Sequence, residues 1–264
     1  MLCSSFARAL AECGASVAVL DLNEESARTV ADEITERGGK ARGVAADVLD
    51  IESLKKARDE IAEHLGPADI LINGAGGNHP AGTTSREYLE PEDLKDAADD
   101  LTTFFDLDPE GIRFVFDLNF LGTLMPTQVF ARDMAEKGTG VIINVSSMNA
   151  FRPLTKIPAY SGAKAAVSNF TQWLAVHFSR SGIRVNALAP GFFLTRQNHK
   201  LLVNDDGSFT ERAEKILAHT PLRRFGVPED LLGTLLWLVD GNASGFVNGT
   251  VIPIDGGFAA YSGV

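Results

Sequence analysis

The stretch MLCSSFARALAECGASVAVLD (residues 1–21) decides the fold class that this sequence indicates. Its apolar residues first recur at helical spacing, and Gly14 follows at a position where helices commonly end. Residues 17–20 then form a short apolar run that is typical of a buried strand, and Asp21 follows this run. The order helix, turn, strand and acid is typical of a dinucleotide-binding α/β fold.

In that fold a strand and a glycine-rich turn precede the first helix, and the N–H groups of the turn hold a pyrophosphate. The sequence leaves no room for either element ahead of its first helix. The usual first strand lies in the middle of the sheet, so its absence leaves unpaired ladders inside the protein. Each buried unpaired backbone group costs on the order of 1–3 kcal/mol, against a total stability of about 5–15 kcal/mol. We therefore expect a sheet that lacks its usual first strand, and a natural start upstream of Met1.

The rest of the chain alternates apolar runs with longer amphipathic stretches, which predicts a parallel sheet covered by helices on both faces. The expected strands are SVAVLD (16–21), ARGVAAD (41–47), DILINGAG (69–76), GVIINVSS (140–147), IRVNALAPG (183–191) and TVIPIDGG (250–257). The expected helices span about 24–37, 51–65, 110–136, 158–180 and 228–239. We predict a single domain over residues 1–264, of the α/β class, with a doubly wound Rossmann-type parallel sheet.

Two segments interrupt this alternation. The first is an acidic insert at about 77–110, and the second is a long loop at about 192–227. The insert carries ten acids against Arg86 and Lys95, a local charge of −8. Loops of this length inside a compact domain are usually functional or disordered. Both segments follow strands at the edge where such sheets bind ligands, so we expect the second to form part of a substrate site.

Composition excludes several classes of partner. A net charge of −11 argues against nucleic acid or an anionic membrane. No apolar run reaches the roughly 20 residues of a membrane span, and the N-terminus has no signal-peptide pattern. The two cysteines, Cys3 and Cys13, favour a reduced compartment and argue against a disulfide framework or a metal site. We expect a cytoplasmic protein that binds no metal.

The stretch 144–170 carries the clearest chemical signal. Tyr160 and Lys164 are four residues apart and share one face of the expected helix. An ammonium near a phenol lowers the phenol pKa, which makes the phenol a usable general acid or base. Ser147 lies at the end of an apolar strand, from which a turn can bring its hydroxyl beside the phenol. Taken alone, the same spacing also fits an ordinary amphipathic helix with a lysine that reaches to solvent.

Seven motifs in order resemble those of the short-chain dehydrogenase/reductase family, over nearly the whole chain. They are ADV (46–48), INGAG (72–76), LNFLG (118–122), NVSS (144–147), YSGAK (160–164), APGFFLT (189–195) and IPIDGG (252–257). The chain departs from the family at two positions. Gly74 replaces the second asparagine of Asn-Asn-Ala-Gly, and Cys3 aligns with the last glycine of the phosphate-binding turn.

The resemblance implies four catalytic residues. Tyr160 exchanges a proton with the substrate oxygen, and Ser147 donates a hydrogen bond to that oxygen. Lys164 binds the nicotinamide ribose and tunes Tyr160, and Asn119 holds a water molecule that relays protons. The cofactor carries the hydride, while the protein supplies position and electrostatics.

The expected cofactor is NAD rather than NADP. An acid at the end of the second strand of the family, here Asp21, accepts hydrogen bonds from ribose hydroxyls and repels the extra phosphate of NADP. No cation follows it closely. The resemblance places these further residues along the cofactor: Asp47, Val48, Asn73, Gly74, Ala75, Gly76, Tyr160, Lys164, Pro190, Gly191 and Thr195.

The substrate segments resemble a branch of the family that interconverts D-mannonate and D-fructuronate in hexuronate catabolism. An anionic sugar acid needs cations for its carboxylate and amides for its hydroxyls. The candidate substrate residues are His79, Asn149, Arg152, Arg196 and Asn198, with Gln197, His199 and Lys200 nearby. The resemblance also implies a homotetramer built on the helices near 110–136 and 158–180.

Three function classes stay open from the sequence. The first is an active NAD-dependent sugar-acid oxidoreductase. The second is the same fold acting on another polyol or keto compound, because fold alone decides little about the substrate. The third is a non-catalytic binding protein that has lost the glycine turn. The four catalytic residues argue against this third class, because a binding protein needs no proton relay.

Overall fold

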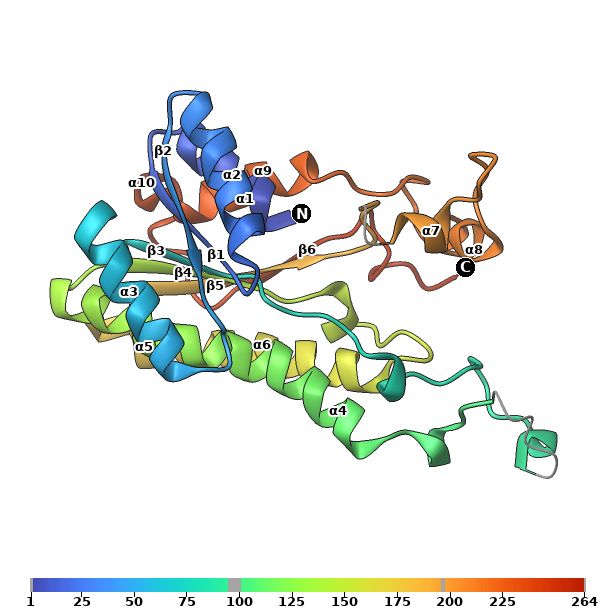
Figure 1. Ribbon diagram of the computed structural model, residues 1–264. Helices are drawn as coiled ribbons and strands as arrows, with labels where there is room; N and C mark the ends of the chain where they lie inside the picture. The colour runs from blue at the N-terminus through green and yellow to red at the C-terminus, as the bar shows by residue number, and fades with distance from the viewer. Residues whose placement is uncertain (1, 95–100, 196–197, 264) are drawn as a thin grey trace.

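Parallel strands lie between two layers of helices in the computed structural model, which describes residues 2–94, 101–195 and 198–263 (Figure 1). The strands are β1 (Ser16–Asp21), β2 (Lys40–Ala45), β3 (Ile70–Asn73), β4 (Gly140–Val145), β5 (Ile183–Pro190) and β6 (Val251–Ile254). The helices are α1 (Leu2–Glu12), α2 (Glu24–Glu36), α3 (Ile51–Leu65), α4 (Pro109–Phe116), α5 (Gly122–Lys137), α6 (Pro158–His177), α7 (His199–Leu202), α8 (Glu211–His219), α9 (Glu229–Val239) and α10 (Gly241–Ser244). The α/β class with a parallel sheet is confirmed.

The helix ends follow the local sequence. Asn23 caps α2 by accepting the N–H of Ser26 at 3.0 Å, and Asp50 caps α3 in the same way. Gly138 ends α5 in the left-handed conformation, with a φ of 75°. The helix expected over 110–136 is divided, because a π-helical turn, η4 (Asp117–Leu121), separates α4 from α5. Such turns are frequent at functional sites, and this one contains Asn119.

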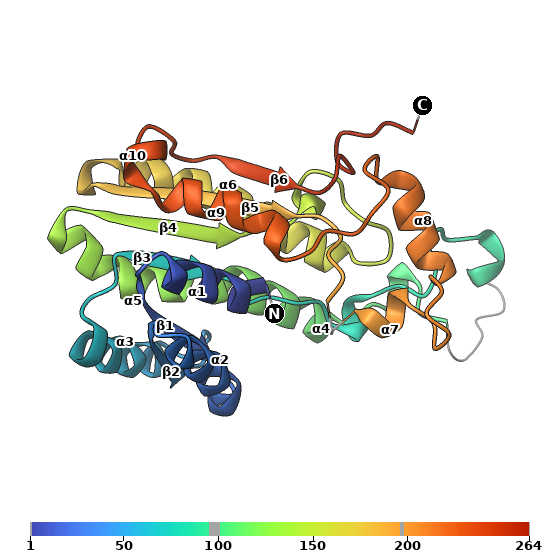
Figure 2. The ribbon, with the colours of Figure 1, turned by 90° about the horizontal axis from the view of Figure 1, so that it is seen from above.

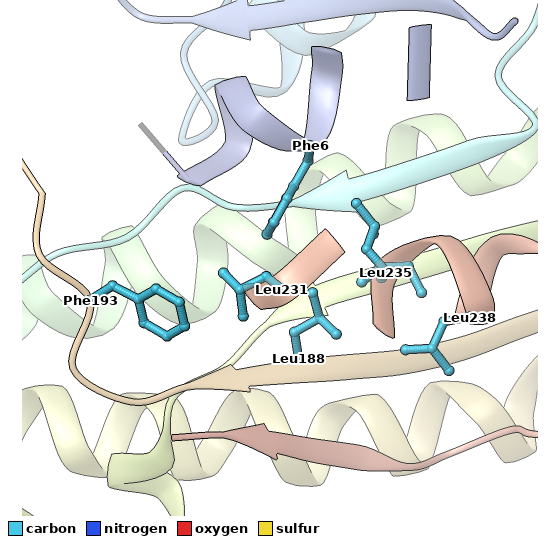
Figure 3. Close-up of a cluster of buried hydrophobic side chains, with 7 residues drawn as sticks. Phe6, Leu188, Phe193, Leu231, Leu235 and Leu238 are labelled. Carbon is cyan, nitrogen blue, oxygen red and sulfur yellow. The ribbon is translucent and has the colours of Figure 1, made fainter. Parts of the chain in front are cut away.

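The strands form two parallel sheets, one with the order β1-β2 and one with the order β3-β4-β5-β6. Helix α1 packs across the seam between them. Phe6 is buried with Ile143 and Leu188 of the larger sheet and with leucines of α9 (Figure 3). Leu10, one turn further on, packs against Val17 of β1. One apolar helix therefore joins the two sheets into one body.

The sequence predicted unpaired ladders enclosed in the core at this seam, and the structure corrects that picture. Only Val17 is buried in β1, and only Asn73 is buried in β3, while the other residues of both strands are half-buried or exposed. Most residues of the two strands that border the seam are therefore not fully buried.

The two long segments meet at one end of the molecule, beyond the carboxyl ends of the larger sheet (Figure 2). Short 3₁₀ turns run through the described part of the acidic insert: η1 (Pro80–Gly82), η2 (Pro91–Leu94) and η3 (Phe104–Asp106). The segment 192–227 contributes α7 and α8. An ion pair of 2.5 Å between Lys215 of α8 and Glu87 of the insert joins the two segments. Both expected interruptions of the sheet are therefore found, and they lie side by side.

Candidate active site

The three residues with the clearest chemical signal come together at the carboxyl end of β4. Ser147 follows β4, and Tyr160 and Lys164 lie one turn apart on α6. Lys164 is buried, and its Nζ donates a hydrogen bond of 2.8 Å to the main-chain carbonyl of Val145. The same ammonium lies 5.7 Å from the centre of the Tyr160 ring. The Tyr160 hydroxyl is hydrogen-bonded to Ser147.

The protonation of the phenol differs from the sequence expectation. Burial raises the pKa of Tyr160 above its ordinary value, and the hydrogen bond from Ser147 partly opposes that rise. Burial also lowers the pKa of Lys164, to about 8. The predicted lowering of the Tyr160 pKa by the ammonium is therefore wrong for this structure, because desolvation is the larger effect.

Asn119 holds the backbone beside these residues. Its Nδ2 donates to the carbonyls of Gly77 and Val115, both at 2.7 Å, and its Oδ1 accepts the N–H of Gly77 at 3.2 Å. The whole amide is thus used to fix the loop that follows β3. The main-chain carbonyl of Asn119 accepts a hydrogen bond of 2.9 Å from the Thr123 hydroxyl.

The first part of the expected cofactor site lies at the ends of β1 and β2. Asp21 is exposed at the end of β1, and its Oδ1 accepts the N–H of Asn23 at 2.9 Å. Asp47 is half-buried, and its Oδ1 accepts the N–H of Leu49 at 2.8 Å. Val48 packs against Gly122 at the start of α5. Their role in binding a cofactor stays a prediction.

The glycine-rich loop after β3 lies close to the catalytic residues. A Cβ at Gly76 would lie 2.6 Å from Asn119 Oδ1 and 3.0 Å from Lys164 Nζ, so a side chain cannot occupy this place. Ala75 contacts Gly122, beside Val48. A Cβ at Gly74 would lie only 2.1 Å from the thiol of Cys3 on α1. The two departures from the family pattern are therefore in contact.

The side chain of Asn73 is engaged within the protein. It is 4% exposed, and its Nδ2 donates to Thr127 of α5 and to Asn144 of β4, both at 2.9 Å. Asn144 in turn donates to Thr171 of α6 at 2.9 Å. The side chain of Asn73 thus joins the sheet to its helices, which leaves only its main chain for a cofactor.

The turn after β5 is fixed by the end of the chain. Pro190 is buried, and the N–H of Gly191 donates to the carbonyl of Ile254 at 2.9 Å. A Cβ at Gly191 would lie 2.6 Å from Asp255, so this position requires glycine. Thr195 donates from both its N–H and its hydroxyl to Asn198 Oδ1, at 2.8 and 3.1 Å. Asn198, predicted to bind substrate, is therefore engaged in the loop itself.

Two further substrate candidates flank the catalytic residues. His79 follows the glycine-rich loop, and its Nδ1 accepts the N–H of Ala81 at 3.2 Å, which leaves Nε2 as a donor. Its ring lies 5.1 Å from the ring of Phe114. Asn149 lies two residues after Ser147 and is 4% exposed. Its N–H donates to Ser147 Oγ at 3.2 Å, so it belongs to the same turn as the catalytic serine.

Arg152 is exposed, and its Nε donates a hydrogen bond of 3.0 Å to the carbonyl of Ala259. The sequence did not predict this contact, because nothing in residues 258–262 marks them as part of a site. Phe258 in that segment packs edge to face against Phe192 of the substrate loop. His199 and Lys200 are exposed on α7. Arg196 and Gln197 lie outside the described residues.

The described ranges contain no group of three or more His, Cys, Asp or Glu side chains that could bind a metal ion. Within those same ranges no helix is both long and apolar enough to cross a membrane. Cys3 and Cys13 are both free thiols.

The fold and this arrangement of residues define a class of protein. A family model for short chain dehydrogenases matches residues 2–205. The chain belongs to the short-chain dehydrogenase/reductase family, and it is an oxidoreductase that acts on CH–OH groups.

Two curated relatives match the chain over its entire length. An uncharacterized oxidoreductase of Haemophilus influenzae is 58% identical, and the match covers 91% of that protein. The uncharacterized oxidoreductase UxuB of Bacillus subtilis is 54% identical, and the match covers 93% of it.

A crystal structure of a Haemophilus influenzae protein also resembles the chain. It was solved with bound NAD, and its assignment as a D-mannonate oxidoreductase is provisional. That structure is 58% identical, has a TM-score of 0.94, and the match covers 100% of this chain and 93% of the other. The expectation that the chain lacks the usual first strand is not supported by these comparisons.

Proposed function

We propose that this oxidoreductase uses NAD to interconvert D-mannonate and D-fructuronate. The observation that carries the catalytic part is the grouping of Ser147, Tyr160 and Lys164 at the end of β4. The observation that supports the substrate is the 58% identity to the structure with the provisional D-mannonate oxidoreductase assignment. NAD is supported by the cofactor bound in that structure and by Asp21.

The residues of this chain fit a dinucleotide. The exposed carboxylate of Asp21 matches two ribose hydroxyls, and no cation stands next to it in the sequence to favour an added phosphate. Gly76 leaves open the place next to Asn119 and Lys164 that a Cβ would fill. Asp47, Val48 and Ala75 would hold the adenosine half, while Pro190, Gly191 and Thr195 would face the nicotinamide. The bound cofactor would supply the hydride chemistry.

The protein's own contribution is acid–base catalysis at one oxygen. Ser147 Oγ accepts the N–H of Asn149, and its own proton, which is shared with the Tyr160 hydroxyl in this structure, would be donated to a substrate oxygen. The Tyr160 phenol would donate its proton to that oxygen during reduction, and the Tyr160 phenolate would take the proton back during oxidation. Lys164, held by the carbonyl of Val145, would stabilise the phenolate that forms. Asn119 would position the loop after β3 and a relaying water.

An acidic protein needs a local cation to select an anionic substrate. The net charge is −11, so selectivity for a carboxylate must come from the rim of the site. We assign the carboxylate to Arg152, whose Nε is already fixed by Ala259, and we assign Arg196 as a second contact. His79 Nε2 would donate a hydrogen bond to one of the hydroxyl groups.

Arg152→Ala tests this assignment. A charged hydrogen bond is worth roughly 1.5–3 kcal/mol, or about 10–150-fold in efficiency. The variant should lose that factor in kcat/KM for D-mannonate and much less for D-mannitol. Arg37→Ala, which removes an exposed arginine at the C-terminal end of α2, is the matched control. Equal losses on the two substrates would remove Arg152 from carboxylate recognition.

A second candidate function is oxidation or reduction of another polyol or keto compound by the same residues. This function requires the same three residues, Ser147, Tyr160 and Lys164. It differs only in the residues around them that would bind the rest of the substrate. A higher kcat/KM for uncharged polyols than for D-mannonate would favour it.

We also propose a cytoplasmic homotetramer. Large apolar side chains are exposed along the helices that the family resemblance assigns to assembly: Phe114, Phe116, Trp173 and Val176. The rings of Phe170, Trp173 and His177 form a stacked row on α6. Light scattering of the wild type and of Trp173→Glu tests this surface, since a monomeric or unchanged mass in both would contradict it.

A further inference from the structure

The side chain of Asn149, two residues after Ser147, carries an unused hydrogen-bond acceptor. It is 4% exposed, and its Oδ1 has no hydrogen-bond partner among the described residues. Buried polar atoms in proteins nearly always have a partner, so an exception calls for an explanation. One explanation is that a ligand supplies the missing donor.

The position of this residue relative to the reacting group is fixed. Ser147 caps the 3₁₀ turn η5 (Met148–Ala150), and its Oγ accepts the N–H of Asn149 at 3.2 Å. The buried side chain of Met148 anchors the turn, and η5 packs against α6, which carries Tyr160. Asn149 therefore lies in a packed turn, two residues after the serine to which we assign the reacting oxygen.

The chemistry of the orphan atom limits what it can bind. A carbonyl oxygen accepts hydrogen bonds and donates none, so its partner must carry an O–H or N–H group. A carboxylate or a keto oxygen cannot satisfy it. In a sugar acid the groups next to the reacting carbon are hydroxyls, and they are donors of the required kind.

We infer that Asn149 Oδ1 accepts a hydrogen bond from a substrate hydroxyl on a carbon adjacent to the one that is oxidised. The enzyme then requires a vicinal diol and discriminates against substrates that have one isolated hydroxyl. This inference rests on the proposed function, and it names the feature of the substrate that the site selects. A site built to bond a hydroxyl rejects the analogue that lacks it, because the acceptor is left buried without a partner.

The test compares D-mannonate with its two analogues that lack a hydroxyl on either carbon next to the reacting one. We expect the wild type to have a kcat/KM for D-mannonate about 10–100-fold above that for one of the two analogues. Asn149→Ala should reduce this preference to within about threefold. Asn149→Ser, which keeps a small polar side chain, serves if the alanine variant does not fold. An unchanged preference in the folded variant would overturn the inference.

Ser161→Ala is the matched control. Ser161 lies next to Tyr160, is equally buried at 5% exposure, and its Oγ also has no hydrogen-bond partner among the described residues. Its loss should change kcat/KM for D-mannonate and the analogues by the same factor. A preference that falls equally in the Ser161 and Asn149 variants would mean that packing, and not the acceptor, is responsible.

The inference and the proposed function fail in different ways. A wild type that does not oxidise D-mannonate contradicts the proposed function alone. Calorimetry with the NADH complex then measures the affinity for glycerate and for lactate, which differ by one hydroxyl. A preference for glycerate that is lost in Asn149→Ala supports the inference. Equal affinities in the wild type would refute it.

Discussion

Lys164 is held by the main-chain carbonyl of Val145, through a hydrogen bond of 2.8 Å at the end of β4. This contact places the ammonium beside Tyr160 in a buried site, 5.7 Å from the ring centre. Burial lowers the pKa of Lys164 to about 8, against about 10.5 for an unperturbed lysine. The buried position that brings the Lys164 ammonium close to Tyr160 therefore also disfavours the charged form of Lys164.

The first prediction concerns stability and pH. Between pH 8 and 10.5 the unfolded chain binds the Lys164 proton more tightly than the native protein does, so the free energy of unfolding rises with pH across that window. The rise in the free energy of unfolding that is due to Lys164 reaches up to about 3 kcal/mol, at 1.36 kcal/mol per pKa unit. Lys164→Met should remove it. Denaturant unfolding of both proteins at several pH values measures the difference, and parallel pH profiles would show that the pKa of Lys164 is not lowered.

The second prediction is that Tyr160→Phe abolishes turnover and preserves the fold. The change deletes one hydroxyl, which is hydrogen-bonded to Ser147. General acid–base groups contribute roughly 10²–10⁴-fold to rates. Tyr88→Phe, which removes the same group from a residue that is 73% exposed on the insert, should keep full activity. More than about a tenth of wild-type kcat in Tyr160→Phe would exclude proton transfer by this residue.

The third prediction is that the enzyme prefers NAD(H) to NADP(H), and that Asp21→Ala narrows the gap chiefly by improving NADP. The carboxylate is exposed at the end of β1, where it would meet the extra phosphate. Steady-state kinetics with both cofactors measure the ratio. Asp32→Ala removes the same charge from an exposed position on α2 and should leave the ratio unchanged. Equal efficiencies with the two cofactors in the wild type would contradict the assignment.

The fourth prediction concerns the two departures from the family pattern. Because a Cβ at Gly74 would lie 2.1 Å from the Cys3 thiol, Gly74→Asn should destabilise the protein by about 1–3 kcal/mol. Cys3→Gly should relieve the clash in the double variant. A double-mutant cycle by thermal unfolding measures the coupling between the two sites. Additive effects would show that Cys3 and Gly74 are independent.

Most of the fold follows from sequence patterns. The apolar runs gave every strand of the described fold to within a few residues, because parallel strands buried by helices on both faces have few polar positions. The π-helical turn at Asn119 has no such signal, since its residues continue the helical pattern on both sides. The sequence of α1 did not predict that this helix packs across the seam, because that packing depends on how the two sheets are placed relative to each other.

The site was predictable only in part. Residue types and order predicted Ser147, Tyr160 and Lys164 as catalytic candidates, because catalysis requires specific chemical groups, and the structure brings the three residues together. The directions of side chains were not predictable. Asn73 and Asn198 both carry amides suited to a ligand, yet each is used within the protein. The contact of Arg152 with Ala259 joins segments that are 107 residues apart, and no local pattern reports such a contact.

The most direct test of the proposed function is to incubate the purified wild-type protein with NAD and D-mannonate and follow NADH absorbance, with the product identified by NMR. We predict that NADH and D-fructuronate form in equal amounts, with a kcat/KM at least tenfold above that for D-mannitol, and that Tyr160→Phe shows no turnover. Absence of NADH with D-mannonate, while an uncharged polyol is oxidised, would contradict the sugar-acid assignment. Binding of NADH without turnover of any polyol or sugar acid would instead indicate a binding protein.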